Sequence, residues 1–142
     1  MIDSSYAIIE FATNALEEEF VWGEKDCVWL AREITRIKTG LDRLADAIPS
    51  YSTKGTATKA YNKVVSFEEA LEGIGAFEVP LTHVTLGDMV FVRADSNESK
   101  TQNMCVYLGR GNVITANEDN TGFQIVKALK NISDDYIAYR VI

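Results

Sequence analysis

The residue of this sequence best placed for chemistry is Cys27, which follows Asp26 at the start of an apolar, helix-periodic segment. Asp26 is a good N-cap residue, so Cys27 would lie in the first turn of that helix. Unpaired backbone N–H groups and the positive end of the helix dipole favour a thiolate there, and the thiolate is the reactive form of cysteine. The spacing therefore predicts a thiol nucleophile at Cys27. The alternative is a small buried residue that closes the helix start, since free cysteines are often buried.

The sequence lacks the motifs of most other catalytic and cofactor sites. It has no phosphate-binding loop, no Cys-x-x-Cys and no His-Glu-x-x-His, and Gly109-Arg110-Gly111 is typical of a hairpin turn rather than of a dinucleotide site. The sequence has one histidine, His83, whereas most histidine-based metal sites need more than one. Two cysteines, Cys27 and Cys105, indicate free thiols rather than a disulfide scaffold. We expect no cofactor and no bound metal.

Length and charge indicate an ordinary globular chain with one domain, residues 1–142. The chain has 142 residues, of which 46% are hydrophobic and 25% charged, and it carries a formal charge of −7. That charge argues against non-specific binding to nucleic acid or to an anionic membrane. The amino terminus lacks a secretory pattern and no apolar run approaches the ~20 residues of a membrane span. We expect synthesis and folding in a cytosol, with no nucleic-acid or membrane partner.

Hydrophobic periodicity divides the chain into a helical part, about 1–75, and a sheet part, about 86–142. A stripe from Ile8 to Phe20 predicts a first helix, with Asp3, Ser4 or Ser5 as its cap, and Gly40 closes a second that starts at Cys27. Shorter helical segments are predicted at 44–48, 58–65 and 66–75, around a loop at 50–58. Runs rich in β-favouring residues, separated by turn signals, predict strands at 89–93, 104–108, 113–116, 123–128 and 137–141. The order predicts an α+β fold, with amino-terminal helices packed on a carboxy-terminal antiparallel sheet of about five strands.

Several short motifs together resemble a known family, the NlpC-type, papain-like cysteine peptidases that cut cell-wall peptides, and more closely a phage-enriched relative of it. The resemblance covers most of the chain and implies a papain-like fold. The motifs that carry it are Trp22-Gly23-x-x-Asp26-Cys27, Tyr51-Ser52-Thr53, Leu86-Gly87-Asp88-Met89-Val90-Phe91, Met104-Cys105-Val106-Tyr107-Leu108-Gly109-x-Gly111 and Tyr139-Arg140-Val141.

The resemblance assigns the nucleophile to Cys27 but not a general base. The family's histidine position is Asn103 here, and its third polar position is Thr115. The resemblance also implies that Asn103, Cys105 and Tyr107, which alternate along one strand, face the helix that carries the nucleophile. Asparagine cannot accept a proton at neutral pH, and general-base help is typically worth ~10²–10⁴ in rate. We therefore expect weak or no peptidase activity, unless His83 folds over the cleft as a substitute base.

These residues, taken with the resemblance, lead to three alternative functions. The first is a phage virion protein of the tail or tail tip, a structural or docking module with a degenerate catalytic site, whose partners are other virion proteins. The second is a working thiol hydrolase that opens peptidoglycan during phage entry, with Cys27 as nucleophile and His83 or a partner's residue as base. The third is a small intracellular binding module without a viral role.

Overall fold

The computed structural model describes residues 4–21, 24–44, 67–92, 104–116, 121–127 and 136–142. Within them the chain is α+β, with amino-terminal helices and an antiparallel sheet, as predicted. The helices and the 3₁₀ turn are α1 (Ser5–Ala15), α2 (Cys27–Thr39), α5 (Phe67–Gly73) and η1 (Leu81–His83). The strands are β1 (Phe77–Val79), β2 (Met89–Val92), β3 (Cys105–Gly109), β4 (Asn112–Ala116), β5 (Phe123–Lys127) and β6 (Tyr136–Arg140).

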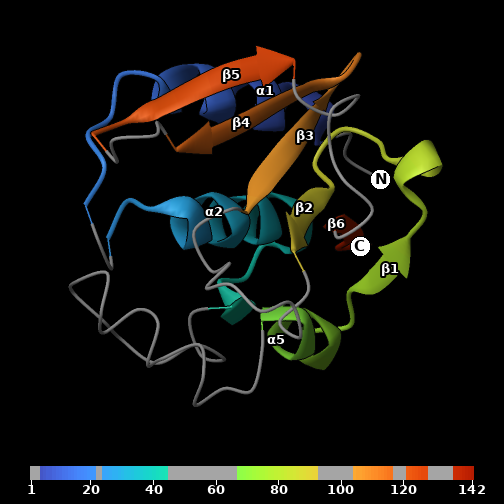
Figure 1. The fold of residues 1–142 in the computed structure, drawn as a ribbon. Coiled ribbons are helices and arrows are strands. Elements are labelled where there is room, and N and C mark those ends of the chain that lie inside the picture. Colours follow the sequence, from blue (N-terminus) through green and yellow to red (C-terminus); the bar gives the residue numbers. More distant parts are fainter. Residues whose placement is uncertain (1–3, 22–23, 45–66, 93–103, 117–120, 128–135) are drawn as a thin grey trace.

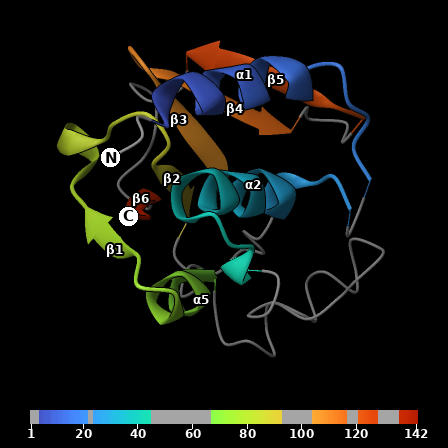
Figure 2. The same cartoon turned by 180° about the vertical axis from the view of Figure 1, so that it is seen from behind.

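The sheet has six strands in the order β1-β6-β2-β3-β4-β5, and every pair is antiparallel. Strands β2 to β5 follow one another along the chain, while β6 returns to pair with β2 (Figure 1). Helices α1 and α2 lie side by side on one face of this sheet, α1 against β4 and β5, and α2 against the middle strands (Figures 1 and 2). The architecture is therefore a two-layer one, in which the helices cover a single face.

Both faces of the sheet carry buried apolar residues, but only one of them forms a core with the helices. That core joins Ile8 and Ala12 of α1 and Leu30 and Ile34 of α2 to alternate residues of the strands. Its strand residues are Met89, Phe91, Met104, Val106, Ile114, Phe123, Ile137, Tyr139 and Val141. The opposite face holds a smaller cluster of Val79, Val90, Cys105, Val113 and Ala138. Because side chains alternate along a strand, this division fixes the direction of each strand residue.

The second helix matches its prediction closely because local signals define both of its ends. Asp26 is the N-cap residue, and Gly40 ends the helix in the left-handed conformation with φ 80°, where its N–H donates to the carbonyl of Arg36. The first helix is shorter than predicted, because it ends at Ala15. Its N-cap residue is Ser4, whose side chain makes no capping hydrogen bond. Three glutamates follow that end, where the negative pole of the helix dipole disfavours acidic residues.

Strand β1 was not predicted, and it extends the predicted five-stranded sheet to six. It has only three residues, and its partner β6 lies some 60 residues further along the chain, so no local pattern indicates it. The sheet part therefore begins at Phe77 rather than near residue 86. The helix predicted at 66–75 is present as α5. The predictions at 45–48, 50–58 and 58–65, including the Tyr51-Ser52-Thr53 motif, lie outside the described residues, as does the carboxy-terminal end of the strand predicted at 123–128.

Candidate functional site

The start of α2 is built as the sequence predicts, with the backbone of Cys27 as the first helical residue. The Asp26 carboxylate accepts a hydrogen bond of 3.0 Å from the Trp29 N–H, and Asp26 is only 2% exposed. Such a cap contributes about 1 kcal/mol to helix stability. Val28, Leu30 and Ala31 bury the first turns in the core, so they hold this helix end firmly. Cys27 is thus placed where a helix dipole can favour a thiolate.

Trp29 is a packing residue beside the cysteine turn. Its ring lies 5.1 Å from that of Phe11 and 5.5 Å from that of Phe123, measured between centroids. Phe20 lies beyond the end of α1 but still packs on Phe123, at 5.9 Å. These rings join the two helices to β5. The other tryptophan of the cysteine motif, Trp22, lies outside the described residues.

The side chains of strand β3 face the opposite sides of the sheet from those that the family resemblance implies. Met104 and Val106 pack with the helices, whereas Cys105 and Tyr107 belong to the cluster on the opposite face. The expectation that Cys105 and Tyr107 face the helix of Cys27 is therefore wrong. Both sets of alternating side chains in this strand are apolar, so the sequence pattern does not show which set faces the helices. Asn103, at the family's histidine position, lies outside the described residues.

Thr115 also lies on the face that α2 does not cover. It pairs with Gln124 in the register of β4 and β5, and its neighbour Ile114 points into the helical core. By strand alternation the Thr115 side chain points to the other face, the one that holds Val113. The structure therefore does not bring Thr115 to the start of α2.

The 3₁₀ turn that contains His83 lies on the opposite side of the domain from the start of α2. His83 is an exposed residue of η1, which is separated from the start of α2 by the width of the domain in both views (Figures 1 and 2). Its Nδ1 lies 3.2 Å from the Thr82 hydroxyl, and its backbone carbonyl accepts a hydrogen bond of 3.0 Å from Arg140. This placement does not support His83 as a substitute base for Cys27.

Cys105 is a second thiol with a well-defined environment. It is buried in the apolar cluster on the face away from the helices, where it pairs with Val90 of β2, and burial raises its pKa to about 12. Burial also raises the pKa of Tyr136, with a further contribution from a charged Cys105. A thiol with so high a pKa stays protonated and unreactive at neutral pH. Cys105 is therefore a core residue rather than a nucleophile.

We expect the burial of Cys105 to make the free energy of unfolding fall at alkaline pH. Its pKa is about 12 in the folded chain, against an unfolded thiol near ~8.5. The stabilisation is complete below the unfolded pKa and is lost as pH rises towards the folded pKa, by up to about 1.4 kcal/mol per pH unit. Urea unfolding at a series of pH values should show this slope in Cys27→Ala. A slope that persists unchanged in the double variant Cys27→Ala/Cys105→Ala would contradict the assignment.

The most highly organised polar cluster is one that sequence reasoning missed. Asp88, at 0% exposure, accepts two hydrogen bonds from Arg140, at 3.0 Å from Nε and 2.9 Å from Nη2, and a third of 2.8 Å from the Thr85 N–H. The Asp88 carboxylate raises the pKa of Arg140. Beside them Lys38 donates a hydrogen bond of 3.1 Å to the Val141 carbonyl, and burial lowers its pKa.

This cluster explains two of the family-like motifs as one structural unit. The Gly87-Asp88 turn and the Tyr139-Arg140-Val141 strand, 52 residues apart, are joined by the Asp88–Arg140 ion pair. The Asp88 carbonyl accepts from the Tyr107 N–H and the Gly87 N–H donates to the Tyr107 carbonyl, both at 2.8 Å. The cluster therefore fixes β2, β3 and β6 to each other. Its groups are satisfied by one another, which indicates a structural role.

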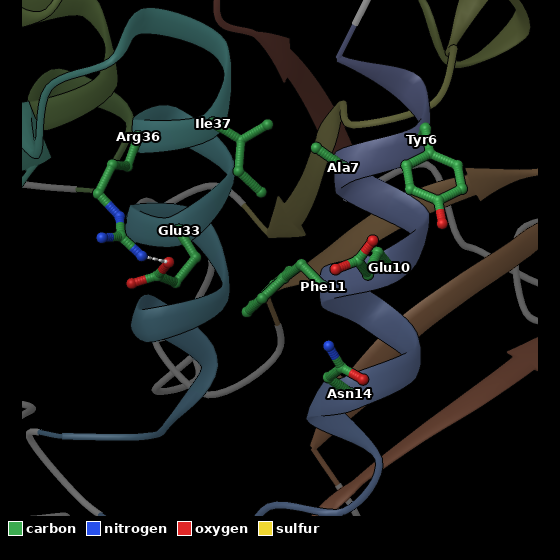
Figure 3. Close-up of a pocket in the computed structure, with 8 residues that line it drawn as sticks. All are labelled: Tyr6, Ala7, Glu10, Phe11, Asn14, Glu33, Arg36 and Ile37. Atoms are coloured by element: carbon green, nitrogen blue, oxygen red, sulfur yellow. Dashed lines mark hydrogen bonds and ion pairs between the residues drawn. The ribbon is translucent and has the colours of Figure 1, made fainter.

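A groove of about 330 Å³ separates the outer faces of α1 and α2 (Figure 3). Phe11 and Ile37 contribute apolar surface, and Glu33 pairs with Arg36 on the α2 side. The other lining residues are Tyr6, Ala7, Glu10 and Asn14 of α1. The lining has acids, an amide and a phenol but no cysteine or histidine, so this groove is separate from the thiol chemistry considered above.

Among the residues that the structure describes, no group of three or more His, Cys, Asp or Glu side chains is arranged to hold a metal ion. None of the described helices is long and apolar enough to cross a membrane.

Comparison with known proteins gives one family match. A search of the curated proteins finds no match. A scan against protein families matches residues 4–133, which is most of the chain, to the family described as a domain of unknown function, DUF6950. The matched region runs from the start of α1 across α2, α5 and strands β1 to β5. The chain therefore belongs to the DUF6950 family.

Proposed function

We propose that this chain is a structural or docking protein of a bacteriophage virion, in the tail or tail tip, built on a papain-like scaffold whose thiol site is catalytically degenerate. The phage setting comes from the motif resemblance alone. The proposal places the chain in the virion after synthesis in the host cytoplasm, with other tail or tail-tip subunits as its partners. It includes no nucleic-acid or membrane partner, in keeping with the charge of −7.

The observation that carries the proposal is that neither His83 nor Thr115, the described candidates for a catalytic polar partner, lies near the start of α2. The turn that contains His83 lies across the domain from the start of α2, and Thr115 points to the sheet face that α2 does not cover. A thiol without a base depends on the helix dipole alone, which is worth on the order of 0.3–1 kcal/mol, or less than one pKa unit. That is small against the ~10²–10⁴ in rate that a general base typically supplies.

The rest of the domain supports a scaffold role. The start of α2 is capped and packed, and the Asp88–Arg140 ion pair fixes three strands. A peptidase fold that has lost its base keeps these stabilising features, because the core and the caps do not depend on catalysis. The fold can then serve as a rigid body that presents its surface to neighbouring subunits.

A second candidate is an active thiol hydrolase that cleaves peptidoglycan peptides, and the position of Cys27 favours it. As the first residue of α2, Cys27 lies beside backbone N–H groups that have no partner within the helix, and these could form an oxyanion site. This function needs a base other than His83, from elsewhere in the chain or from a partner.

We expect the chain to copurify with intact phage particles from a host that produces it. Particles banded by density gradient and digested for mass spectrometry should contain its peptides at a fixed ratio to the major tail protein. Gold-labelled antibodies raised against the purified chain should bind the tail and not the capsid. Particles that infect normally but lack these peptides would contradict the virion proposal, whatever the outcome for catalysis.

A further inference from the structure

Among the described residues, strand β5 is a regular edge strand of the sheet. It is the last strand in the sheet order, and in the described part of the chain no strand pairs with its outer side. Its five residues pair with β4 without a register shift and include no proline. An edge strand of this kind exposes backbone N–H and C=O groups that can pair with another strand. Ile125, at the centre of β5, is 40% exposed.

The flank of α1 that faces away from α2 carries a matching apolar stripe. Ile9 and Leu16 are 43% and 42% exposed, and with Thr13 they follow the i, i+4, i+7 spacing of one helix face. Phe11 and Asn14 point to the groove beside α2 instead (Figure 3). The core-facing side of the helix is a third surface, made by Ile8, Ala12 and Ala15. The exposed stripe therefore lies on the side of α1 opposite α2.

The stripe and the open strand belong to one surface. Ile125 pairs with Ile114, which points into the helical core, so the Ile125 side chain lies on the face of the sheet that α1 covers. Helix α1 lies against β4 and β5 in both views (Figures 1 and 2). Ile9, Leu16 and Ile125 thus border the same edge of the domain. None of these residues, nor Thr13 between them, is charged, in a chain with a net charge of −7.

We propose that a second copy of this chain docks on this edge, with β5 of each copy paired antiparallel about a two-fold axis at Ile125. In this register Ile125 opposes the same residue of the copy, Phe123 opposes Lys127, and Gln124 opposes Val126. Like charges directly opposite each other would be destabilising, and this register opposes none. Such an isologous contact closes as a dimer and covers the β5 edge of each copy.

A second copy fits this surface better than a lone peptide strand. A peptide strand could pair with β5 and cover Ile125, but it has nothing to place against the stripe on α1. A second copy carries its own α1 on the same face of the continued sheet, so Ile9 and Leu16 of the two copies would meet across the axis. This inference goes beyond the virion proposal and stands or fails independently of it.

Sedimentation equilibrium of the full chain tests the proposal. We expect twice the mass of the 15.8 kDa chain for the wild type across the micromolar range. Ile125→Lys and Ile9→Lys, tested separately, should each weaken the dimer by more than about 100-fold, because each buries a charge without a partner. Leu41→Lys is the matched control, since Leu41 is 55% exposed outside this surface, and it should remain dimeric.

Ile9→Lys keeps the test valid if Ile125→Lys fails to fold, because Ile9 is an exposed helix residue. Oxidative crosslinking then checks the register. In a Cys27→Ala/Cys105→Ala background, Ile125→Cys should form a disulfide dimer, whereas Gln124→Cys, which opposes Val126, should not. A monomeric wild type would overturn the proposal. A dimer that survives both lysine substitutions, or one in which Gln124→Cys crosslinks as well as Ile125→Cys, would overturn it too.

Discussion

Replacing Asp88 with alanine should lower the free energy of unfolding by about 3 kcal/mol, the scale expected when one partner of a buried ion pair is removed. Asp88 is fully buried, and it accepts hydrogen bonds from Nε and Nη2 of Arg140 and from the Thr85 N–H. The substitution leaves those donors without their acceptor. It also leaves Lys38 and Arg140 as neighbouring cations without the carboxylate that offsets them. Urea unfolding followed by circular dichroism measures the loss.

Asp42→Ala is the matched control, because it removes an exposed pair of the same chemistry. Arg32 donates to Asp42 from Nε and Nη2, at 3.4 and 2.8 Å, and the two side chains are 33% and 39% exposed. Exposed pairs of this kind contribute about 0–1 kcal/mol. We expect the Asp42 variant to lose less than a third of what the Asp88 variant loses. Equal losses would show that the Asp88 cluster has no special structural role.

Gly87→Ala should lower the free energy of unfolding by about 2–4 kcal/mol, for two separate reasons. Gly87 has φ +92°, a conformation that strains any residue with a Cβ. A Cβ there would also lie 2.9 Å from Cδ1 of Ile8 and 2.9 Å from Cε of Lys38. Ile8 is buried in the core and Lys38 donates a hydrogen bond to the Val141 carbonyl, so moving either side chain away disturbs a packed or hydrogen-bonded group. Thermal and urea unfolding of the variant measure the effect.

Two other glycines separate these reasons. Gly40 has φ +80° but open space around its Cβ position, so Gly40→Ala should show the backbone strain alone, about 1–2 kcal/mol. Gly73 ends α5 with open space and no positive φ, so Gly73→Ala should be neutral or slightly stabilising. If Gly87→Ala costs no more than Gly40→Ala, the close contact with Ile8 and Lys38 does not constrain the turn.

The parts of the fold that were predicted correctly are those fixed by neighbouring residues. Asp26 and Gly40 set the ends of α2 through local hydrogen bonds, so a short stretch of sequence contains the whole signal. The five longer strands were predicted because each is a run of residues that favour β-structure, with turn residues beside it. Strand β1 and the Asp88–Arg140 ion pair depend on partners more than 50 residues away, and no local pattern can reveal them.

The candidate site was predicted only in part for a related reason. The position of Cys27 at a helix start is local and was predicted correctly. The direction of β3 is not local, because Met104 and Val106 on one side and Cys105 and Tyr107 on the other are all suited to burial. Which of these side chains face the helices is determined by the packing of the helices on the whole sheet. The position of His83 likewise depends on the whole fold, which sets η1 and the start of α2 on opposite sides of the domain.

The central proposal is that Cys27, at the start of α2, has no activating base among the residues that the structure describes. Release of soluble peptides from purified peptidoglycan, for the wild type, Cys27→Ala and Cys105→Ala, tests this claim most directly. We predict that the wild-type rate equals that of Cys27→Ala within error, on cell walls of both Gram types. A wild-type rate that is retained in Cys105→Ala and lost in Cys27→Ala would contradict the account and establish a thiol hydrolase.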